Sequence, residues 1–451
     1  MAEKGLAIIL AAGEGKRMKS SLPKVLHPVA GLPMLLHVIK AANDSGIDRC
    51  AVVVGNQAER VAAAAGESGH AVSTHVQAER LGTAHAVLAA ADAVSDDLSH
   101  VVILNGDVPL VLPETIAAAG KSIAGGADLV VLGFHSDDPS GYGRMIMDGD
   151  ELLDIREHRD ASDEEKKITF CNSGIMAFRS SHVLEILQAI DNNNSQGEYY
   201  LPDAIGIARK KGLKVIAAEV PEVETLGVND REQLAGIEEL WQKRRRSQLL
   251  HEGVSMAAPH TVMLSHDTIV EEDVVIEPNV VFSGGVTVRK GATIRAFSHL
   301  EGAIVGEDSV VGPYARLRPG TRLGQTTKVG NFVETKNADV QDGAKINHLS
   351  YVGDASVGAG ANIGAGTITC NYDGVNKHHT EIGKGAFIGT NSSLVAPVSV
   401  GDGAMTAAGS VISKDVEAGA LAIERSPQVN KPGLAAKLWR RNRAIKDAAK
   451  K

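Results

Sequence analysis

Short apolar segments alternate with amphipathic segments from residue 1 to about residue 228. The apolar segments are AIILAA (7–12), CAVVVG (50–55) and HVVILNGD (100–107). The amphipathic segments between them are PMLLHVIKAANDSG (33–46) and a stretch that ends near Gly69. This alternation predicts an α/β fold around a mostly parallel sheet. Ligands bind at the carboxyl ends of the strands in such sheets, and Gly13 and Asp107 both follow a predicted strand.

Beyond about residue 255 the apolar positions recur every six residues, with a shift of one residue between Leu300 and Val305. The recurring positions are Val270, Ile276, Phe282, Val288, Ile294, Leu300, Val305, Val311, Leu317, Leu323, Val329, Val340, Ile346, Val352, Val357, Ile363, Ile382, Ile388, Leu394, Val400 and Ile412. One inward apolar side chain per six residues predicts a three-sided parallel β-helix, with about eighteen residues in each coil.

The six-residue repeat is interrupted twice, around Lys336 to Asp339 and from Thr369 to Glu381. At the second interruption the polar sequence TCNYDGVNKHHT is expected to project from the coil. The repeat alone is compatible with a bare scaffold or a trimerisation rod. A rod needs no projecting loops, however, and such loops commonly carry function.

The segment DREQLAGIEELWQKRRRSQLL (230–250) places Leu234, Ile237 and Trp241 at helical spacing and predicts a linker helix. The chain would then divide into residues 1–229, the linker 230–250 and residues 251–451. The basic run from Lys243 to Arg246 could contact an anion, but a solvated helix face is the more typical role of such a run.

The composition fits two globular regions, one of them built from small side chains. Of the 451 residues, 43% are hydrophobic and 22% are charged, whereas aromatic residues make up only 3% and there are 48 glycines. Few aromatic residues and many glycines are expected where small aliphatic side chains pack between tight, repeated turns. The net charge of −9 argues against a general nucleic-acid-binding protein, although local groups of Lys and Arg can still bind small anions.

The cysteines and the N-terminus favour a cytoplasmic protein. Cys50, Cys171 and Cys370 lie far apart and show no CxxC spacing, as expected in a reducing compartment. The apolar run near the N-terminus is too short for a signal peptide or a membrane span.

A glycine-rich turn, LAAGEGKRM (10–18), follows the first predicted strand, and Lys24 comes shortly after it. Backbone N–H groups in such a turn can approach phosphates, and Arg17 and Lys24 can neutralise a triphosphate. A glycine-rich turn alone is equally typical of a tight strand-to-helix connection. The third glycine of a dinucleotide fingerprint is missing and basic residues follow instead, which favours a nucleoside triphosphate over NAD.

The sequence LNGDVPL (104–110) places Asp107 at the end of a buried strand. An uncompensated charge there would be costly, and Mg²⁺ would compensate it. An Asp after a strand is also a common turn former or helix cap, so Asp107 by itself does not decide between the two roles.

Polar motifs fall in consecutive coils of the predicted β-helix and place Arg318, Lys336, His348, Tyr351 and Asn362 at spacings that would bring them together. The motifs are GPYARLRPG (312–320), GNFVETK (330–336), NHLSYVGD (347–354) and NIGAGTITCNYDG (362–374). Arg318 and Lys336 suit a phosphate, and His348 has the ordinary pKa of a base near neutrality. Any one of these residues alone could be a surface polar residue, so the interpretation depends on the group.

Further motifs extend the pattern along the chain. They are QAERLGTAHA (77–86), GYGR (141–144), EHRDA (157–161), CNSGI (171–175), NNNSQGEYYLPD (192–203) and GVND (227–230). In this order they resemble the nucleoside-diphosphate-sugar pyrophosphorylases. With the β-helix behind them, nearly the whole chain resembles the bacterial bifunctional N-acetylglucosamine-1-phosphate uridyltransferase/glucosamine-1-phosphate N-acetyltransferase family.

The resemblance implies a Rossmann-like uridyltransferase domain at 1–229 and a left-handed parallel β-helix of hexapeptide repeats, the acetyltransferase domain, at 251–451. Such an enzyme transfers an acetyl group from acetyl-CoA to glucosamine-1-phosphate. It then transfers a uridylyl group from UTP to N-acetylglucosamine-1-phosphate and releases pyrophosphate. The product, UDP-N-acetylglucosamine, supplies peptidoglycan and lipopolysaccharide synthesis. A cytoplasmic homotrimer without nucleic-acid partners or a membrane span is also implied.

The resemblance further assigns residues of the first domain. It implies that Leu10, Ala11, Ala12 and Gly13 contact the nucleotide, that Arg17 and Lys24 act on its phosphates, and that Gln77, Gly82 and Thr83 read the uracil. Asp107 and Asn229 would hold Mg²⁺, Asn105 and Gly106 would contact the nucleotide sugar, and Gly143, Glu157 and Asn172 would bind the sugar and its acetamido group. Lys16 and Asn105 depart from the family's usual Thr and its usual Tyr or Ser.

In the second domain the resemblance assigns His348 as the base. Arg318, Lys336, Tyr351 and Asn362 would bind glucosamine-1-phosphate, and Ala365, Asn371, Tyr372, Thr390, Ala408 and Arg425 would contact acetyl-CoA. Thr390 replaces the usual Ser but keeps the hydroxyl group. The basic tail KLWRRNRAIKDAAKK could help to hold CoA phosphates or form a solvated terminal helix.

Two other functions remain open from the sequence. One is a different sugar-nucleotide pyrophosphorylase whose β-helix only regulates or oligomerises. The other is a structural or binding assembly protein in which the repeat is a trimer stalk.

Overall fold

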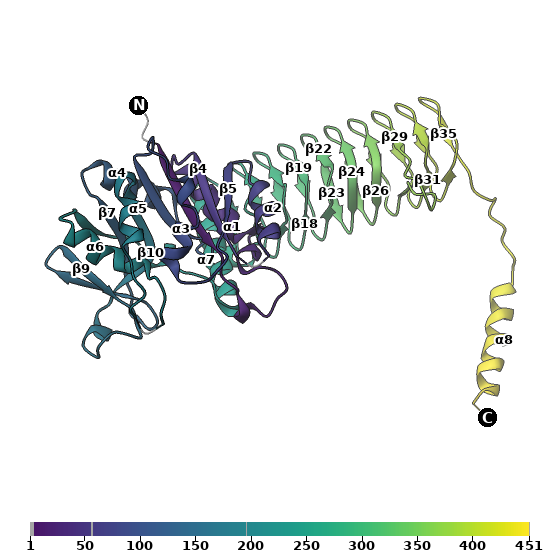
Figure 1. Ribbon diagram of the computed structural model, residues 1–451. Helices are drawn as coiled ribbons and strands as arrows, with labels where there is room; N and C mark the ends of the chain where they lie inside the picture. Colours follow the sequence, from purple (N-terminus) through teal and green to yellow (C-terminus); the bar gives the residue numbers. More distant parts are fainter. Residues whose placement is uncertain (1–3, 56, 195, 451) are drawn as a thin grey trace. The chain divides into compact units, whose positions relative to one another are not determined.

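A computed structural model describes residues 4–55, 57–194 and 196–450 (Figure 1). Residues 1–3 of the predicted first segment and Ser195 of the motif 192–203 lie outside the described residues. The chain divides into two compact units. The first unit holds residues 1–248 and 264–266, and the second holds residues 249–263 and 267–451.

The first unit is built on a nine-stranded sheet with the order β11-β7-β10-β6-β1-β4-β5, and β8 and β9 form a hairpin beside β10. The strands are β1 (Gly5–Ala11), β4 (Arg49–Val54), β5 (Ala71–Val76), β6 (His100–Asn105), β7 (Leu129–His135), β8 (Arg144–Asp148), β9 (Glu151–Arg156), β10 (Phe170–Arg179) and β11 (Val215–Glu219). Strand β10 runs antiparallel to β6 and β7, and the other neighbours along this order are parallel. The expectation of a mostly parallel sheet is confirmed. Strand β5 was not expected because its side chains are largely exposed at the sheet edge and form no apolar run.

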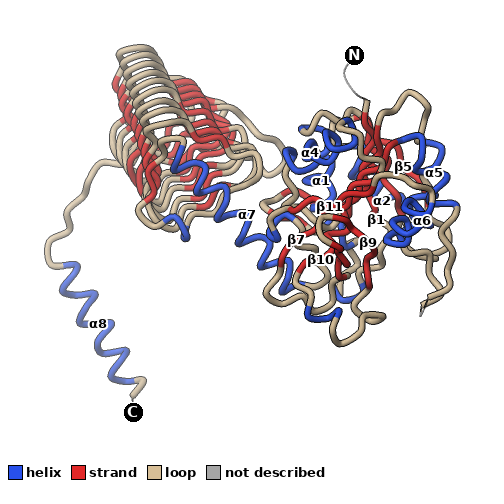
Figure 2. The backbone as a smooth tube through the Cα atoms, turned by 90° about the vertical axis from the view of Figure 1, so that its left-hand side faces the viewer, coloured by secondary structure: helices blue, strands red, loops and turns tan. Residues whose placement is uncertain are grey.

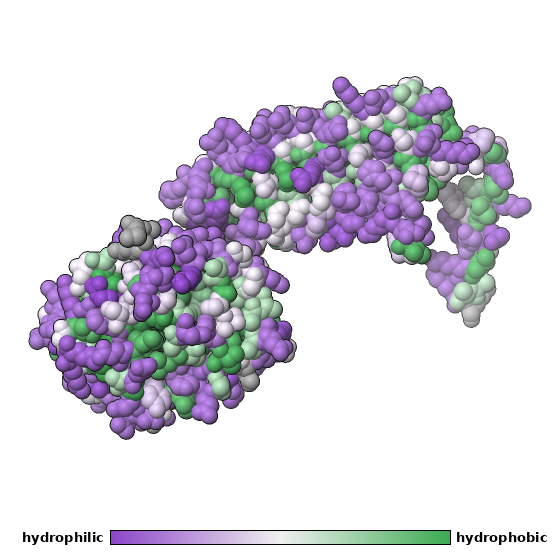
Figure 3. All heavy atoms as spheres, turned by 45° about the horizontal axis from the view of Figure 1, so that its top comes forward, coloured by the Kyte–Doolittle hydropathy of each residue, from purple (hydrophilic) through white to green (hydrophobic). Residues whose placement is uncertain are grey.

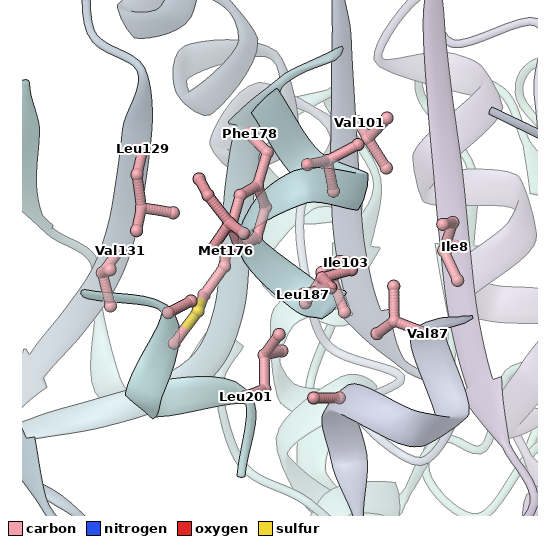
Figure 4. Packing of buried hydrophobic residues seen from close by; sticks show 14 of the residues in the cluster. Ile8, Val87, Val101, Ile103, Leu129, Val131, Met176, Phe178, Leu187 and Leu201 are labelled. Carbon is pink, nitrogen blue, oxygen red and sulfur yellow. The ribbon is translucent and has the colours of Figure 1, made fainter. Parts of the chain in front are cut away.

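Helices cover both faces of this sheet (Figure 2). Their bounds are α1 (Met34–Asp44), α2 (Ala58–Gly66), α3 (Thr83–Leu88), α4 (Pro113–Ala124), α5 (Ser180–Gln188) and α6 (Ala204–Lys210). Helices α1, α2 and α4 pack on one face, and α3, α5 and α6 pack on the other. Figure 4 shows the second core, where Ile8 and Ile103 of the sheet point toward Val87 of α3 and Leu187 of α5. These two layers hold the strand ends of the sheet in fixed positions.

Two apolar side chains of helix α7 (Arg231–His251), Ile237 and Trp241, are buried. Gln242 extends this packing, since its side chain donates to the carbonyl of Leu264 at 2.6 Å and accepts from the Leu264 N–H at 2.9 Å. Arg244 donates to the carbonyl of Leu110 at 3.0 Å, and Arg246 is buried. The expectation that the basic run is a solvated face is therefore wrong for Arg246, because helical spacing alone does not show how much of a helix is covered.

The second unit is a parallel β-helix, with its coils stacked as in Figure 1. One side is formed by β12 (Ser255–Met256), β14 (Val275–Ile276), β17 (Thr293–Ile294), β20 (Val310–Val311), β23 (Lys328–Asn331), β25 (Lys345–His348), β27 (Asn362–Ile363), β30 (Phe387–Ile388), β33 (Met405–Thr406) and β35 (Leu421–Ala422). The other sides are formed by β13 (Ile269–Val270), β15 (Val281–Phe282), β16 (Thr287–Val288), β18 (His299–Leu300), β19 (Ala303–Val305), β21 (Arg316–Leu317), β22 (Thr321–Leu323), β24 (Glu334–Val340), β26 (Tyr351–Val357), β28 (Ile368–Cys370), β29 (Thr380–Ile382), β31 (Ser393–Val395), β32 (Val398–Val400) and β34 (Val411–Ile412). All the apolar positions of the predicted repeat are buried.

The register of the strands explains the irregularities of the repeat. Val270 lies opposite Val288, and Val288 lies opposite Val305, so successive coils use 18 and 17 residues. Lys336 to Asp339, where the repeat is first interrupted, lie within the continuous strand β24. The second interruption does project: Val357 pairs with Ile382, 25 residues later, because the segment between β28 and β29 is inserted into this coil.

The chain ends in helix α8 (Leu434–Ala448), in which no residue is buried. Apolar side chains are also exposed on the coils, where Figure 3 shows hydrophobic residues between hydrophilic ones. Within the described part of the chain, no helix combines the length and the apolar character needed to cross a membrane.

Candidate active sites

A pocket opens at the carboxyl ends of β1 and β6, where the α/β fold predicts a ligand site. Its lining includes the predicted residues Leu10, Ala11, Ala12, Gly13, Lys24, Gln77, Gly82, Thr83, Asn105 and Asp107. Gly106 lies beside them, because its N–H donates to the carbonyl of Leu10 at 2.9 Å. The structure therefore brings together the glycine-rich turn, the 77–83 segment and the end of β6.

Two close backbone approaches shape this pocket. Gly15 has φ +64°, and a Cβ atom there would lie 2.7 Å from the Cβ of Lys24. Gly82 has φ +113°, and its Cβ would lie 2.5 Å from the carbonyl oxygen of Tyr199. The N–H of Leu201 also donates to the hydroxyl of Thr83 at 2.9 Å. Contacts with the 199–201 segment thus hold the 82–83 turn in place.

Asp107 and Asn229 converge on one cation, the ammonium group of Lys24. Lys24 Nζ pairs with Asp107 Oδ2 and lies 3.4 Å from Asn229 Oδ1. A carboxylate and an amide oxygen around one positive charge form a donor set of the kind that Mg²⁺ takes, with the remaining positions left to water or phosphate. Among the described residues no group of three or more His, Cys, Asp or Glu side chains could hold a metal. Asp107 and Asn229 thus direct two oxygen atoms at one position beside the pocket.

The three residues assigned to the sugar lie together beside this pocket. A Cβ on Gly143 would lie 3.3 Å from Glu157 Oε1 and 3.6 Å from the Cβ of Asn172. The side chain of Asn172 accepts from the N–H of Gly174 at 3.0 Å, and a Cβ on Gly174 would lie 2.6 Å from Nδ2 of Asn105 on the pocket wall. Burial, with smaller contributions from Asp160 and Asp203, raises the pKa of Glu157.

Arg17, which was expected to act on the nucleotide phosphates, is exposed and does not line the pocket. Arg80, which was not among the predicted residues, lines the pocket and pairs with Glu14 of the glycine-rich turn. Glu14 also pairs with Lys16, 2.5 Å away, and these two cations lower its pKa. An ion pair therefore connects the glycine-rich turn to Arg80, and Lys16 faces the same carboxylate.

In the β-helix, three backbone hydrogen bonds and one bond from the Arg425 side chain connect His348 to the residues assigned to acetyl-CoA. The donors and acceptors are Gly366 N–H to His348 O (3.2 Å), Asn391 N–H to Ala365 O (2.8 Å), Gly409 N–H to Thr390 O (2.8 Å) and Arg425 Nη1 to Ala408 O (2.7 Å). Each bond joins one coil to the next. His348, Ala365, Thr390, Ala408 and Arg425 therefore follow one corner of the β-helix.

The His348 ring has a defined orientation. It is exposed at the end of β25, and its Nδ1 lies 2.9 Å from Oδ1 of Asn331 in the adjacent strand. An amide oxygen only accepts hydrogen bonds, so Nδ1 carries the proton of this bond. In the neutral ring Nε2 then keeps its lone pair, as a base requires.

Lys336 and Asn371 meet at Asp354. Lys336 Nζ lies 3.4 Å from both carboxylate oxygens, and the side chains of Asn337 and Asn371 each donate to one of them. Burial disfavours the charged carboxylate, but the hydrogen bonds from Asn337 and Asn371 and the charge of Lys336 lower the pKa of Asp354. In the projecting loop the backbone of Lys377 forms an antiparallel β-bridge with that of Tyr372. The neighbouring Lys336 lowers the pKa of Lys377.

The remaining sugar-phosphate candidates lie in the same coils. Arg318 pairs with Glu334 at 2.8 Å, and Glu334 lies opposite Tyr351 in the neighbouring strand. Asn362 lies on β27 opposite Lys345 of β25, the strand that ends at His348. The structure therefore brings Arg318, Lys336 and Tyr351 into one region and places Asn362 on the sheet of His348.

Six residues that contact the candidate residues of the two units were not predicted from the sequence: Glu14, Arg80, Asn331, Glu334, Asp354 and Lys377. In the β-helix a signal was available, because residues 17 positions apart lie in neighbouring coils, as Asn331 and His348 do. No comparable spacing relates Glu14 to Arg80.

Comparison with known proteins identifies two domain families in the chain. Residues 7–251 match the family model of the MobA-like NTP transferase domain, and residues 379–414 match the bacterial transferase hexapeptide repeats. A "Bifunctional protein GlmU" of Sinorhizobium medicae is 56% identical over 99% of this chain and 98% of its own length. A protein of the same name from Agrobacterium fabrum is 55% identical over 100% of both chains. Another, from Rhizobium etli, is 54% identical over 99% of this chain and 98% of its own length.

These similarities extend through both units. They argue against a pyrophosphorylase with an inactive β-helix and also against a structural stalk. The predicted combination of a uridyltransferase and an acetyltransferase in one chain is confirmed. The chain belongs to the family of bifunctional GlmU proteins.

Proposed function

We propose that the pocket at the ends of β1 and β6 is the site of uridylyl transfer from UTP to N-acetylglucosamine-1-phosphate. The observation that supports this most strongly is the convergence of Asp107 and Asn229 on the Lys24 ammonium. The glycine-rich turn would present backbone N–H groups to the phosphates. Gly143, Glu157 and Asn172 would bind the sugar and its acetamido group.

The chemistry of this step requires positioning and positive charge rather than a base. The attacking oxygen of the sugar phosphate is already anionic, so no proton has to be removed from it. Lys24 would move from Asp107 onto a phosphate and stabilise the charge that develops there. Arg17 would have to turn toward the pocket to act on the phosphates. Asp107 and Asn229 would hold Mg²⁺, which when bound supplies positive charge at the phosphate oxygens.

For the second unit we propose that the corner with His348 is the site of acetyl transfer. The amino group of glucosamine-1-phosphate is largely an ammonium ion at neutral pH, and only the free amine can attack the thioester carbonyl. His348 Nε2 would take the proton, because Asn331 holds the proton of the neutral ring on Nδ1. Arg318, Lys336, Tyr351, Asn362 and the newly found Lys377 would bind the sugar phosphate, and Ala365, Asn371, Tyr372, Thr390, Ala408 and Arg425 would contact acetyl-CoA.

We also propose a homotrimer that works in the cytoplasm, where Cys50, Cys171 and Cys370 would stay reduced. Exposed apolar side chains on the coils are compatible with packing against other copies.

Two separate assays test the assignment. Release of free thiol from acetyl-CoA on addition of glucosamine-1-phosphate measures the second site, and release of pyrophosphate from UTP on addition of N-acetylglucosamine-1-phosphate measures the first. Both activities should be present in one preparation. If Asp107→Asn leaves pyrophosphate release at its normal rate under limiting Mg²⁺, the assignment of the metal ligands is wrong.

A further inference from the structure

Asp354 is a buried carboxylate between two groups of residues that the proposed function assigns to different substrates. It lies in β26, next to β24 (Figure 1), and its side chain contacts Lys336, Asn337 and Asn371. Only 8% of the residue is exposed. A buried charge is costly unless it is paired and hydrogen-bonded, and here both carboxylate oxygens have donors.

The backbone does not explain why this position carries a charge. Asp354 has φ +48° at a corner of the β-helix, and Asn337 occupies the same corner one coil earlier with φ +45°. Gly320 takes this corner in the coil before, since a Cβ on Gly320 would lie 3.0 Å from the Cα of Asn337. Asn and Gly adopt the left-handed conformation readily, so either would satisfy the backbone at residue 354. The negative charge must have another role.

The hydrogen bonds indicate what that role is. Lys336 Nζ lies 3.4 Å from both oxygens, so the carboxylate holds the ammonium from one side. On the other side Asn371 donates to Oδ2, and Asn371 is the first residue after β28, where the projecting loop begins. One carboxylate therefore fixes a cation assigned to the sugar phosphate and the base of a loop assigned to acetyl-CoA.

We propose that Asp354 is a positioning residue that couples the two substrate subsites of the acetyltransferase. It touches neither substrate in this arrangement. It sets the direction of the Lys336 ammonium and the start of the 371–379 loop together, so that disturbance of one reaches the other. The inference depends on the proposed roles of Lys336 and Asn371.

Asp354→Asn tests this inference because Asn fits the backbone and removes only the charge. The amide lacks the negative charge with which the carboxylate holds the Lys336 ammonium. Its NH₂ group is also a hydrogen-bond donor and would face the donating side chain of Asn337 or Asn371. Hydrogen bonds to charged groups are among the stronger ones in proteins. We therefore expect loss of the charge to raise the KM values for both glucosamine-1-phosphate and acetyl-CoA by on the order of 10- to 100-fold. At saturating substrates kcat should change much less, since His348 and Asn331 are untouched.

Matched variants separate this role from a general loss of stability. Asp342 is a turn carboxylate of the same β-helix that accepts the N–H of Gln325 at 2.8 Å, so Asp342→Asn should leave both KM values unchanged. Circular dichroism and thermal melting of each full-length variant report on folding of the β-helix, because these residues lie in the second unit. If Asp354→Asn does not fold, Asp354→Gly replaces it, because glycine already occupies this corner at Gly320.

Lys336→Ala and Asn371→Ala complete the experiment. If these two variants are impaired and Asp354→Asn keeps both KM values within about twofold, well below the expected effect of a charged hydrogen bond, the inference is wrong and Asp354 is only structural. If Lys336→Ala and Asn371→Ala acetylate normally, the proposed subsites are wrong and the inference falls with them. A rise in both KM values with a preserved kcat supports it.

Discussion

Replacement of Gly82 by Ala should weaken UTP binding without affecting acetyl transfer. Gly82 has φ +113° and ψ 176°, a conformation that side-chain-bearing residues rarely adopt. Its added Cβ would lie 2.5 Å from the carbonyl oxygen of Tyr199 and 2.7 Å from its nitrogen. Both contacts are backbone atoms, so the clash cannot be relieved by a side-chain rotation.

The size of the effect follows from these contacts. A residue held in such a backbone region costs about 1–3 kcal/mol, and relief of the clash requires the 82–83 turn to move away from Tyr199. That movement would strain the bond from Leu201 N–H to the Thr83 hydroxyl and the 3.2 Å bond from Gln77 to the Gly82 carbonyl. Misplacement of a binding residue by about 1 Å can cost on the order of 100-fold, so we expect kcat/KM for UTP to fall by about 10- to 100-fold.

Pyrophosphate release at varied UTP measures this effect, and thiol release from acetyl-CoA by the same protein shows that the second unit is intact. Gly206→Ala is the matched control, because Gly206 lies inside helix α6 and an added Cβ would have no neighbour within 4 Å. If Gly82→Ala keeps the normal KM for UTP and the normal melting temperature, the 82–83 turn does not depend on the close approach to Tyr199, and the argument is wrong.

Four further predictions concern both units. Asp107→Asn should remove most Mg²⁺-dependent pyrophosphate release and spare thiol release; equal loss of both would indicate unfolding instead. His348→Ala should lower kcat for thiol release by about 10²- to 10⁴-fold, the usual contribution of a general base, and a change below about threefold would contradict that role. Burial lowers the pKa of His37 to about 4. The stability that the neutral ring contributes is therefore complete above pH 6.5 and falls by up to about 3 kcal/mol as the pH decreases through 4. His37→Gln should flatten that decline in denaturant titrations. A fragment ending at residue 251 should keep uridylyl transfer and melt higher than one ending at 229, which lacks the buried Trp241; equal melting temperatures would show that α7 adds nothing.

The core of the β-helix could be predicted in detail because its rule is local. Each side of a coil uses about six residues and turns one apolar side chain inward, so the period alone identifies the buried positions. The end of the first strand and its glycine-rich turn were predictable for a similar reason. Strand β5 was not, because an exposed edge strand carries no apolar period. The burial of Arg246 depends on packing across the chain, which a helical pattern does not contain.

The site residues divide along the same line. Residues whose type and place in a motif already indicate a role, such as Lys24, Asp107 and His348, were predicted. Glu14 and Arg80 were missed because their pairing depends on how two loops fold toward each other. Asn331 and Asp354 were missed although the coil length gives the neighbours of His348 and Asn371 directly: each partner lies 17 residues earlier.

The residues at the corner beside His348 change in size along the β-helix. At this corner Phe297, Tyr314, Phe332 and Leu349 all have positive φ and exposed side chains, and the three aromatic rings stack from coil to coil with centroids 5.0 and 5.3 Å apart. In the following coils the corner is taken by Gly366, Asn391 and Gly409, again with positive φ. The same backbone therefore accepts large and small residues, and the change in size comes between Leu349, which follows His348, and Gly366 in the next coil. Bulky side chains would cover the coils before the proposed base, whereas small ones leave the backbone open beside Ala365, Thr390 and Ala408, where the proposed function places the long acetyl-CoA molecule.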